Sequence, residues 1–204
     1  MSNPQTAETK QSQDTATRTR NRNRLLDATA SLLSAGEPLK KLSISRIVET
    51  AGMSRAAFYL HFRSKEDIIR ILADREVSSW IEFAMPTLDR SMVSRSELSQ
   101  LAARIISVYR AHCGVLSGII ELAEYDEETR SAWLETIHSI AARLEVALCS
   151  WRPDLSDNEA ASLAKMIAWA CERFLHQEVR NTSTDQDELF TAVITELVWK
   201  VVQT

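Results

Sequence analysis

The sequence predicts an all-α protein, with a small helix-turn-helix domain at its N-terminus and a larger helical bundle after it. Three observations predict this fold class. Apolar residues recur at intervals of three and four along most of the chain, and residues suited to helix N-termini precede these repeats. No segment alternates apolar and polar residues between turns, as a half-buried strand does. We therefore expect about nine helices and no sheet.

Composition favours a cytoplasmic protein with a substantial core. Of the 204 residues, 45% are hydrophobic, which is enough to bury a core. No apolar run approaches the ~18 residues of a membrane span, and the polar N-terminus does not resemble a signal peptide. The three cysteines include no C-x-x-C pair. They suit a reducing compartment better than a disulfide framework.

Charge is unevenly distributed along the chain. Residues 1–75 carry 13 Lys/Arg and 8 Asp/Glu, a net of +5, whereas residues 76–204 carry a net of −9. Such asymmetry is typical of a chain in which one part binds nucleic acid. A difference of this size also arises by chance, so it supports the interpretation without establishing it.

The first residues predict a flexible basic arm. Residues 1–17 are almost wholly polar, and we expect them to be a disordered arm. Arginines then occur at every second position, at Arg18, Arg20, Arg22 and Arg24. In an extended arm these side chains would project to one side and follow a phosphate backbone or enter a minor groove. A solvated tail that leads into the first helix is an equal alternative.

Residues 18–63 have the succession of elements that a helix-turn-helix domain requires. An apolar stripe over residues 25–33 predicts the first helix. Ser43 is suited to cap a short second helix that ends at Gly52, and Ser54 is suited to cap the third. A tight glycine turn between two short helices is the arrangement found in helix-turn-helix domains.

The segment 53–65 predicts a two-faced helix. Phe58 and Phe62 lie four residues apart and share one face. Cationic and hydrogen-bonding side chains lie off that face, namely Arg55, Tyr59 and His61, with Lys65 just beyond the helix end. Such a helix suits a surface that meets phosphates and base edges. An ordinary amphipathic helix with solvated charges is the alternative.

Helix signals continue through residues 64–204. Capping signals for the successive helices stand at Ser64, Ser94, Asp126, Ser156 and Thr184 or Asp185. The helix from Ser64 to Pro86 would span about 30 Å, long enough to join the basic part to the rest. We expect Gly114 and Gly118 to interrupt or kink the helical segment that contains them.

The segment 42–66 resembles the DNA-binding signature of TetR-type transcriptional regulators. It reads Leu-Ser-Ile-Ser-Arg-Ile-Val-Glu-Thr-Ala-Gly-Met-Ser-Arg-Ala-Ala-Phe-Tyr-Leu-His-Phe-Arg-Ser-Lys-Glu. The matching features are a Ser-started helix, Ala-Gly-x-Ser, and aromatic-Tyr-x-His-Phe-x-Ser-Lys-Glu. Trp133, the pair Glu172-Arg173 and Trp199 are similar to residues of the ethionamide-repressor-like branch of that family.

The resemblance implies specific contacts with double-stranded operator DNA. The expected DNA-binding residues are Ser43, Ser54, Arg55, Ala56, Tyr59, His61 and Lys65. Arg55 and Ala56 would face base edges, because arginine binds guanine through two donors and alanine packs on a thymine methyl group. Ser43 and Lys65 would bind phosphates near helix N-termini. Tyr59 and His61 would hold phosphates or lie against the DNA backbone. Leu60 is expected to make no specific contact.

Residues 64–204 would then form the ligand-binding and dimerisation domain. Large aromatics are frequent here, namely Trp80, Phe83, Tyr109, Trp133, Trp169 and Trp199. They are typical of a ligand pocket, although each is alternatively plain core. With the resemblance added, the expected ligand-binding residues are Trp80, Phe83, Ile105, Tyr109, Trp133, Ile137, Ala168, Cys171 and Glu172. The small side chains of Ala168 and Cys171 predict a hydrophobic effector with few hydrogen bonds. Glu172 and His176 are candidate anchors, with salt-bridge or capping roles as alternatives.

The resemblance also implies a homodimer that binds a palindromic operator. The last two helices would form its interface through the apolar stripes Leu163, Ile167, Leu175 and Phe190, Ile194, Leu197. Burial of these stripes within one subunit is the alternative. The expected function is a repressor that a small hydrophobic ligand releases from DNA. A transcriptional activator and a helical ligand-binding module without DNA binding are the other interpretations.

Enzyme activity is not expected from this sequence. The four histidines have no metal-ligand spacing, and no nucleophile elbow, C-x-x-C or glycine-rich phosphate loop occurs. The chain has only four glycines, too few to suggest a glycine-rich nucleotide-binding loop. We therefore predict no catalytic residues, no metal and no cofactor.

Overall fold

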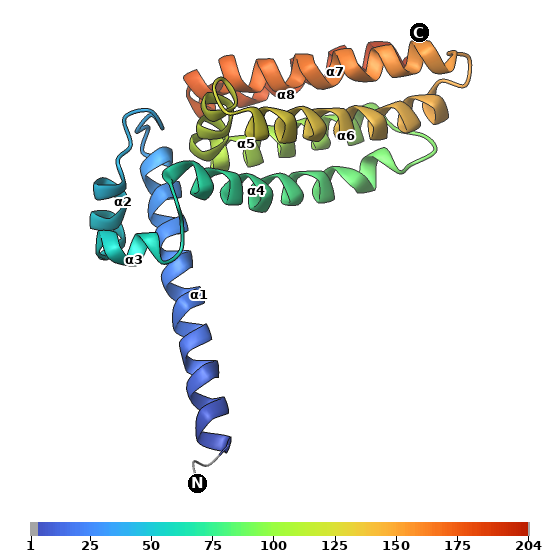
Figure 1. Cartoon of the computed structure of the whole chain (residues 1–204). Helices are drawn as coiled ribbons and strands as arrows, with labels where there is room; N and C mark the ends of the chain where they lie inside the picture. Colours follow the sequence, from blue (N-terminus) through green and yellow to red (C-terminus); the bar gives the residue numbers. More distant parts are fainter. Residues whose placement is uncertain (1–3, 204) are drawn as a thin grey trace.

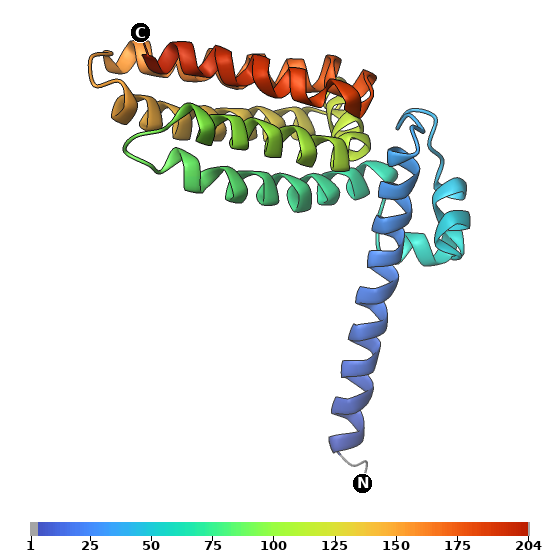
Figure 2. The ribbon, with the colours of Figure 1, turned by 180° about the vertical axis from the view of Figure 1, so that it is seen from behind.

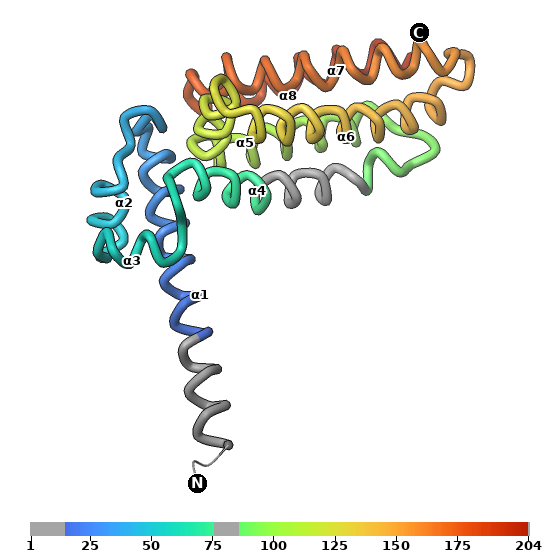
Figure 3. Tube along the Cα trace, in the orientation of Figure 1, coloured from blue at the N-terminus to red at the C-terminus, as the bar shows by residue number. Residues whose placement is uncertain are grey.

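The helices form an elongated bundle, with a smaller group of helices across one end of it (Figure 1). The computed structural model describes the backbone of residues 4–203 and the side chains of residues 15–75 and 86–203. The segments 1–14 and 76–85 are grey in Figure 3. Over the described residues the structure has eight α-helices, two short 3-10 helices and no strand. The predicted all-α class is confirmed.

The helices divide into a group of three and a group of five. Their bounds are α1 Pro4–Ser34, α2 Ile44–Ala51, α3 Arg55–Tyr59, α4 Lys65–Leu88, α5 Arg95–Ala123, α6 Glu127–Trp151, α7 Asp157–Gln177 and α8 Asp187–Gln203, with η1 Val179–Asn181 and η2 Thr184–Gln186 between the last two. Helices α2 and α3 lie beside the C-terminal part of α1, and α4 to α8 lie side by side (Figures 1 and 2).

Most helix starts lie where the capping signals predict them. The side chains of Ser43, Ser54, Ser94, Asp126 and Ser156 each accept a hydrogen bond from the backbone N–H three residues later. Ser94 and Ser156 form complete capping boxes with glutamates at the third helical position. The last helix differs slightly, because η2 precedes it and α8 itself begins at Asp187.

The N-terminal segment differs from the expected disordered arm, since α1 already begins at Pro4. Proline suits the first position of a helix, and residues 5–24 include helix-forming glutamines and arginines and no glycine. They extend a helix that residues 25–33 anchor in the core. In a helix, residues two apart are separated by about 200°. Successive arginines of the 18–24 series therefore lie on opposite sides, so that Arg18 and Arg22 share one side of the helix and Arg20 and Arg24 share another.

Helix α5 is unbroken, contrary to the expected interruption at its glycines. A Cβ at Gly114 would lie 2.4 Å from the backbone nitrogen of Ser34 and 2.5 Å from the carbonyl oxygen of Leu33. A Cβ at Gly118 would lie 3.3 Å from Cδ1 of Leu33. The glycines therefore mark where the end of α1 crosses α5 at close range, and not where a helix ends.

Helix α5 is the central helix of the molecule. It is the one helix of the described residues whose length and composition would suffice to cross a membrane. It packs, however, against α1, α4, α6 and α8, and Leu116, Ile119 and Leu122 are fully buried. Its apolar side chains are therefore largely those of a core helix.

One hydrophobic core runs through both helix groups. It contains Leu25 and Phe58 of the first group together with Val115 and Ile119 of α5. The first turns of α4 belong to the same core, because Ile69 is fully buried in it. The predicted boundary after residue 63 is thus a change of element that the packing crosses, and no gap in the core separates the two groups.

Candidate nucleic-acid interface and ligand cavity

A left-handed glycine sets the angle between α2 and α3. Gly52 has φ 62° and ψ 42°, and its N–H donates to the carbonyl groups of Val48 and Glu49. Nη2 of Arg24 donates a 2.6 Å hydrogen bond to the carbonyl of Ala51, which ties this turn to α1. A Cβ at Gly52 would lie 3.1 Å from the same guanidinium. The backbone angle therefore favours glycine here, and the Arg24 guanidinium would have to shift to admit a larger residue.

Helix α3 has the two faces that the sequence predicts. Phe58 is fully buried and Phe62 is 3% exposed, with their ring centroids 5.7 Å apart. The regular helix is short and ends at Tyr59, but the N–H of Phe62 donates to the carbonyl of Phe58 and continues the turn. On the other side Arg55, Ala56, Tyr59 and Leu60 are exposed. The outward face is available to a ligand as large as duplex DNA.

The two serines among the expected DNA contacts are helix caps. The Ser43 hydroxyl accepts from the N–H of Arg46 at 3.2 Å, and the Ser54 hydroxyl accepts from the N–H of Ala57 at 3.1 Å. Both residues are exposed. A capping hydroxyl uses its oxygen as acceptor and keeps its proton for donation to another group, such as a phosphate.

Arg55 is held on the exposed face by a contact with α2. Its Nη1 donates a 3.1 Å hydrogen bond to Oγ of Ser45. A guanidinium has five N–H groups, so this bond positions the side chain while others remain for a base edge. Tyr59 follows one turn later with 52% of its surface exposed. These residues form a continuous outward surface with Ala56.

His61 lies between α3 and the arginines of α1. It is half-buried, and burial lowers its pKa, with further lowering by Arg18 and Arg22. The guanidinium of Arg22 stands 5.9 Å from the ring centroid of Phe62. The α1 arginines therefore add to the positive charge beside the recognition surface, while the imidazole itself is neutral at pH 7.

Lys65 has a structural role that the sequence did not predict. Its Nζ donates to the carbonyl groups of Leu39 at 2.7 Å, Leu42 at 3.0 Å and Lys40 at 3.5 Å. These bonds tie the start of α4 to the loop between α1 and α2. An ammonium group has three N–H donors. The expected phosphate contact of Lys65 would therefore have to replace one of these bonds.

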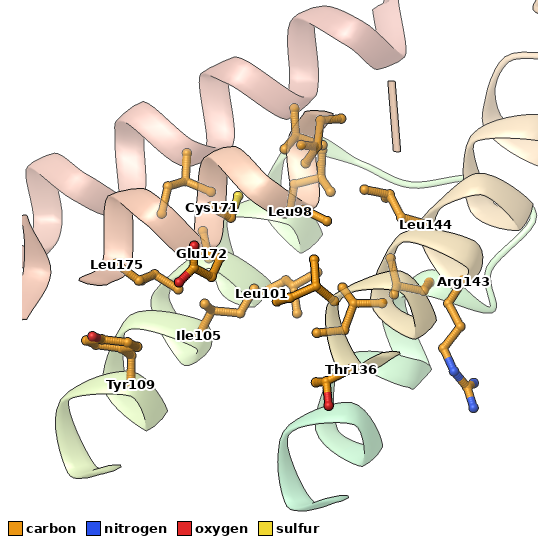
Figure 4. A pocket seen from close by; sticks show the side chains of 18 of the residues that line it. Leu98, Leu101, Ile105, Tyr109, Thr136, Arg143, Leu144, Cys171, Glu172 and Leu175 are labelled. Carbon is orange, nitrogen blue, oxygen red and sulfur yellow. The ribbon is translucent and has the colours of Figure 1, made fainter. Parts of the chain in front are cut away.

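A cavity of about 180 Å³ lies between α5, α6, α7 and α8, with Leu88 of α4 at its edge. Its walls are almost wholly apolar (Figure 4). They include seven of the nine expected ligand-binding residues, namely Ile105, Tyr109, Trp133, Ile137, Ala168, Cys171 and Glu172. Trp80 and Phe83 lie outside the residues whose side chains the structure describes. Trp169 and Trp199 pack against the buried clusters beside the cavity and are not among its lining residues.

Several lining residues were not predicted. They include Leu98, Leu101, Thr136, Ile140, Arg143, Leu144 and Trp151. Many extend the helical stripes on which the predicted residues lie: Leu98 and Ala102 precede Ile105 on α5, and Ile140 and Leu144 follow Ile137 on α6. The spacing of three and four would have identified them, but leucine and isoleucine on a stripe do not distinguish a cavity wall from solid core.

Polar groups are few at the cavity wall, and those on α7 and the middle of α5 are largely buried. Oη of Tyr109 lies 3.3 Å from Nδ1 of His176. Burial raises the pKa of Tyr109 and lowers that of His176. Burial also raises the pKa of the Cys171 thiol to about 11, so this thiol is inert at neutral pH. Glu172 is 9% exposed, and burial raises its pKa against the opposing effect of Arg173.

Polar contacts join helix α5, which lines the cavity, to the N-terminal group of helices α1 to α3 (the recognition group). The carboxylate of Glu121, near the end of α5, accepts from the backbone N–H groups of Leu39 at 3.0 Å and Lys40 at 2.9 Å. Lys40 also forms a salt bridge with Glu124 at 3.1 Å. The loop between α1 and α2 is thus held by Lys65 on one side and by α5 on the other.

The apolar stripes assigned to a dimer interface are mostly internal. Ile167, Leu175, Phe190 and Ile194 are buried within the protomer, Leu163 is half-buried, and Leu197 is exposed. For the four buried residues the alternative of burial within one subunit is therefore correct. Three further apolar side chains are exposed on the same two helices beside Leu197, namely Met166, Leu189 and Val193.

The structure thus combines an exposed helix that carries Arg55, in a helix-turn-helix group, with a helical bundle that contains an apolar cavity, and this is the architecture of helix-turn-helix regulators. Residues 25–71 match the family model described as bacterial regulatory proteins, tetR family. The match covers the three helices of the N-terminal group and the start of α4, which is the part of the chain that has the helix-turn-helix arrangement. No protein of curated function matches the chain.

Solved structures of regulators share the fold over nearly the whole chain. A transcriptional regulator of the TerR/AcrR family from Aquifex aeolicus VF5 superimposes with a TM-score of 0.67, at 20% identity over 89% of this chain and 99% of that one. A TetR-family transcriptional regulator from Bordetella parapertussis 12822 gives 0.67, at 18% identity over 86% and 92%. A gamma-butyrolactone receptor described as ArpA-like gives 0.50, at 19% identity over 91% and 99%. The matched family and these neighbours are regulators and a receptor, not enzymes.

Proposed function

We propose that the protein is a ligand-responsive repressor, which binds a palindromic operator as a homodimer and leaves it when a small hydrophobic molecule enters the cavity. One observation carries this proposal: a single continuous core joins an exposed recognition helix to an enclosed apolar cavity. A change of packing at the cavity therefore has a physical route to the DNA-facing helices.

DNA recognition would use the exposed face of α3. Arg55 and Ala56 would contact base edges in the major groove, while Ser43, Ser54 and Tyr59 would bind the phosphate backbone. His61 lies at the margin of this face and Lys65 behind it, so both are proposed as backbone contacts of lesser weight. The α1 arginines beside His61 would add electrostatic attraction that is independent of sequence.

Dimerisation would use the exposed apolar side chains of α7 and α8. Met166, Leu189, Val193 and Leu197 are each 43–55% exposed in the protomer. A second copy of the same two helices would cover them in a four-helix arrangement. A symmetric dimer then presents two copies of α3 to half-sites about one helical turn, ~34 Å, apart.

The ligand response would be a shift between two spacings of the recognition helices. A ligand can move this equilibrium only by its difference in affinity for the two states. Helices α5 and α6 both line the cavity. Helix α5 is tied to the loop between α1 and α2 through Glu121, and α6 is tied to α4 through a 2.7 Å hydrogen bond from Arg70 to Asp126. The gamma-butyrolactone receptor among the structural neighbours is named for a small, weakly polar ligand, which is in keeping with an apolar cavity here.

Placement in the ethionamide-repressor-like branch is part of the same proposal. Trp133 and Glu172 of that resemblance both line the cavity, and Arg173 lies beside it. A repressor of this kind would act in the cytoplasm, where its operator is.

Electrophoretic mobility shift with the DNA upstream of the protein's own gene tests the proposal. At low ionic strength the wild type should shift a palindromic fragment as a dimer, and Arg55→Ala should lose preference for it. Arg95→Ala, at an exposed salt bridge on α5 distant from α3, serves as the matched control. Absence of any shift would favour a ligand-binding module without DNA binding. A reporter gene in a deletion strain separates repression, in which expression rises, from activation, in which it falls.

A further inference from the structure

Glu172 is a buried carboxylate without a hydrogen-bond partner. Its side chain is 7% exposed, and neither Oε1 nor Oε2 has a partner among the described residues. Nearly all buried polar groups in proteins are hydrogen-bonded, and a buried charge without a partner is strongly unfavourable. A carboxylate without hydrogen bonds at such a place needs an explanation.

The neighbouring arginine compensates this charge only in part. Nε of Arg173 lies 3.7 Å from Oε2 of Glu172, which is too far for a hydrogen bond, and the Arg173 side chain is 59% exposed. Because water screens the exposed guanidinium, its attraction offsets only part of the cost of burying the carboxylate. The nearby hydroxyl of Tyr109 faces Nδ1 of His176. The protein thus leaves both acceptor oxygens of Glu172 available.

The carboxylate lies at the cavity wall. Figure 4 shows Glu172 on α7, directed toward the space between Ile105 and Leu175. Both of these side chains are apolar and line the cavity, as does Cys171 beside them. Arg143, another charged lining residue, is exposed on α6, and its guanidinium lies at the far side of the view, away from Glu172. The carboxylate of Glu172 therefore faces the apolar interior of the cavity, and no labelled cationic side chain lies opposite it in Figure 4.

We propose that the effector is an amine, whose apolar body fills the cavity and whose protonated nitrogen binds the carboxylate of Glu172. This inference rests on the proposed function, because it names the chemical class of the molecule that the cavity would sense. An ammonium group supplies both the missing positive charge and the missing hydrogen-bond donors. A neutral alcohol supplies a donor without the charge, and a carboxylic acid is repelled in its ionised form.

Size limits the apolar body. Cavities of about 150 Å³ lined by aliphatic and aromatic side chains bind benzene. The cavity of about 180 Å³ in this protein is therefore suited to one ring or a short chain together with the amine. Trp133 and Trp151 line it, so that a ring can pack against an indole, and their fluorescence reports occupancy.

Three probes that share a phenylethyl body test the charge preference on the full-length protein without DNA. They are 2-phenylethylamine, 2-phenylethanol and 3-phenylpropanoate, titrated by calorimetry and by tryptophan fluorescence at pH 7. The wild type should bind the amine at least tenfold more tightly than the alcohol, and the alcohol more tightly than the carboxylate. Glu172→Gln should bring amine and alcohol to within about threefold, while affinity for the alcohol stays unchanged. Glu135→Gln, on an exposed residue of α6, should behave as wild type.

A second neutral variant, Glu172→Met, guards against misfolding of the first, and circular dichroism checks both. The inference is overturned if the wild type binds the alcohol or the carboxylate as tightly as the amine, if none of the three binds, or if the preference for the amine survives in a folded Glu172 variant. DNA binding is assayed separately. A Glu172-dependent amine site in a protein that ignores DNA would leave this inference standing and refute the repressor. DNA binding with no amine preference would do the reverse.

Discussion

Nη2 of Arg70 donates a 2.7 Å hydrogen bond to Oδ2 of Asp126, and so joins the second turn of α4 to the N-cap of α6. Nη1 of Arg70 donates to Asp67 at 2.9 Å on its own helix. The other oxygen of Asp126 accepts from the N–H of Thr129 at 2.9 Å. Helix α6 lines the cavity and α4 follows α3 directly. The Arg70–Asp126 pair therefore joins a wall of the cavity to the helix that continues from the helix-turn-helix group.

Arg70→Met should lower the free energy of unfolding by about 1.5–3 kcal/mol at pH 7, the typical worth of hydrogen bonds to a charged group. The hydrogen bond from Arg70 is the first cause that lowers the pKa of Asp126 from 3.8 to about 2. The folded-state pKa is depressed, so this contribution is present above pH 3.8 and is lost as pH falls toward 2.

The measurement is urea unfolding of both proteins between pH 2 and pH 7. The stability gap should close below pH 3.8. Arg95→Met, at an exposed salt bridge with Glu196, should change stability by less than about 1 kcal/mol at any pH. An equal loss in both variants would show that Arg70 and Asp126 form no more than a surface pair.

Arg55→Ala should relax sequence preference at one position of each half-site by ~1–3 kcal/mol, because the bidentate contact with a base edge is lost. Competition binding to operators with a substitution at each position measures this effect. If the variant weakens binding equally on every sequence, Arg55 contacts only phosphate.

Lys65→Ala should lower the free energy of unfolding by about 1.5–3 kcal/mol, since three carbonyl groups lose a charged donor. If Lys65 also binds a phosphate, the slope of log affinity against log salt should decrease by about 0.9 per subunit. Arg63→Ala, on an exposed neighbour, is the comparison for salt dependence. Loss of stability with an unchanged salt slope would reject the phosphate role of Lys65.

Gly114→Ala should destabilise the protein by more than about 2 kcal/mol, because the added Cβ would clash with backbone atoms of Leu33 and Ser34. Gly118→Ala is the matched control on the same helix. Its Cβ would meet only the flexible side-chain ends of Leu33 and Ile69, and alanine favours a helix, so its stability should stay within about 1 kcal/mol of wild type. Thermal unfolding of both variants distinguishes these outcomes. Similar stability in the two would contradict the close crossing.

Glu172→Gln should raise the free energy of unfolding at pH 7 by about 1–3 kcal/mol, because it removes a buried charge that is only partly compensated. Burial raises the pKa of Glu172 above 4.5. The wild type is therefore at no disadvantage below pH 4.5 and loses stability as pH rises through the folded-state pKa. His176, Tyr109 and Arg173 surround the site and are unchanged in the variant. Unfolding at pH 4, 6 and 8 should show a widening gap, and a constant gap would mean that Glu172 does not titrate in this range.

Much of the fold followed from local chemistry. Ser43, Ser54, Asp126 and Ser156 begin helices as predicted because a cap acts within three residues of itself. The faces of α3 followed from the spacing of Phe58 and Phe62. Gly114 was misread because its role depends on a segment eighty residues away, which no local pattern contains.

The cavity residues and the expected DNA contacts were predictable to different degrees. The cavity residues Tyr109, Trp133 and Cys171 were found by resemblance, whereas their neighbours on the same stripes look like any core. Lys65 was assigned to phosphate because lysine near a helix start suits an anion, but three carbonyls of a distant loop occupy it. The apolar stripes of α7 and α8 gave no indication of which side faces inward, since both sides carry large aliphatic residues.

The close contact between the backbones of α1 and α5 at Gly114 has an evolutionary consequence. A helix-turn-helix domain is a natural candidate for exchange between related proteins, because the exchange would give a helical bundle a new DNA target. In this chain the end of α1 packs directly on the backbone of α5 at Gly114. A grafted helix-turn-helix domain would bring its own α1 end to this contact. Chimeras should therefore function only when the donor and the recipient both keep a glycine at this crossing, whatever the similarity of their reading helices.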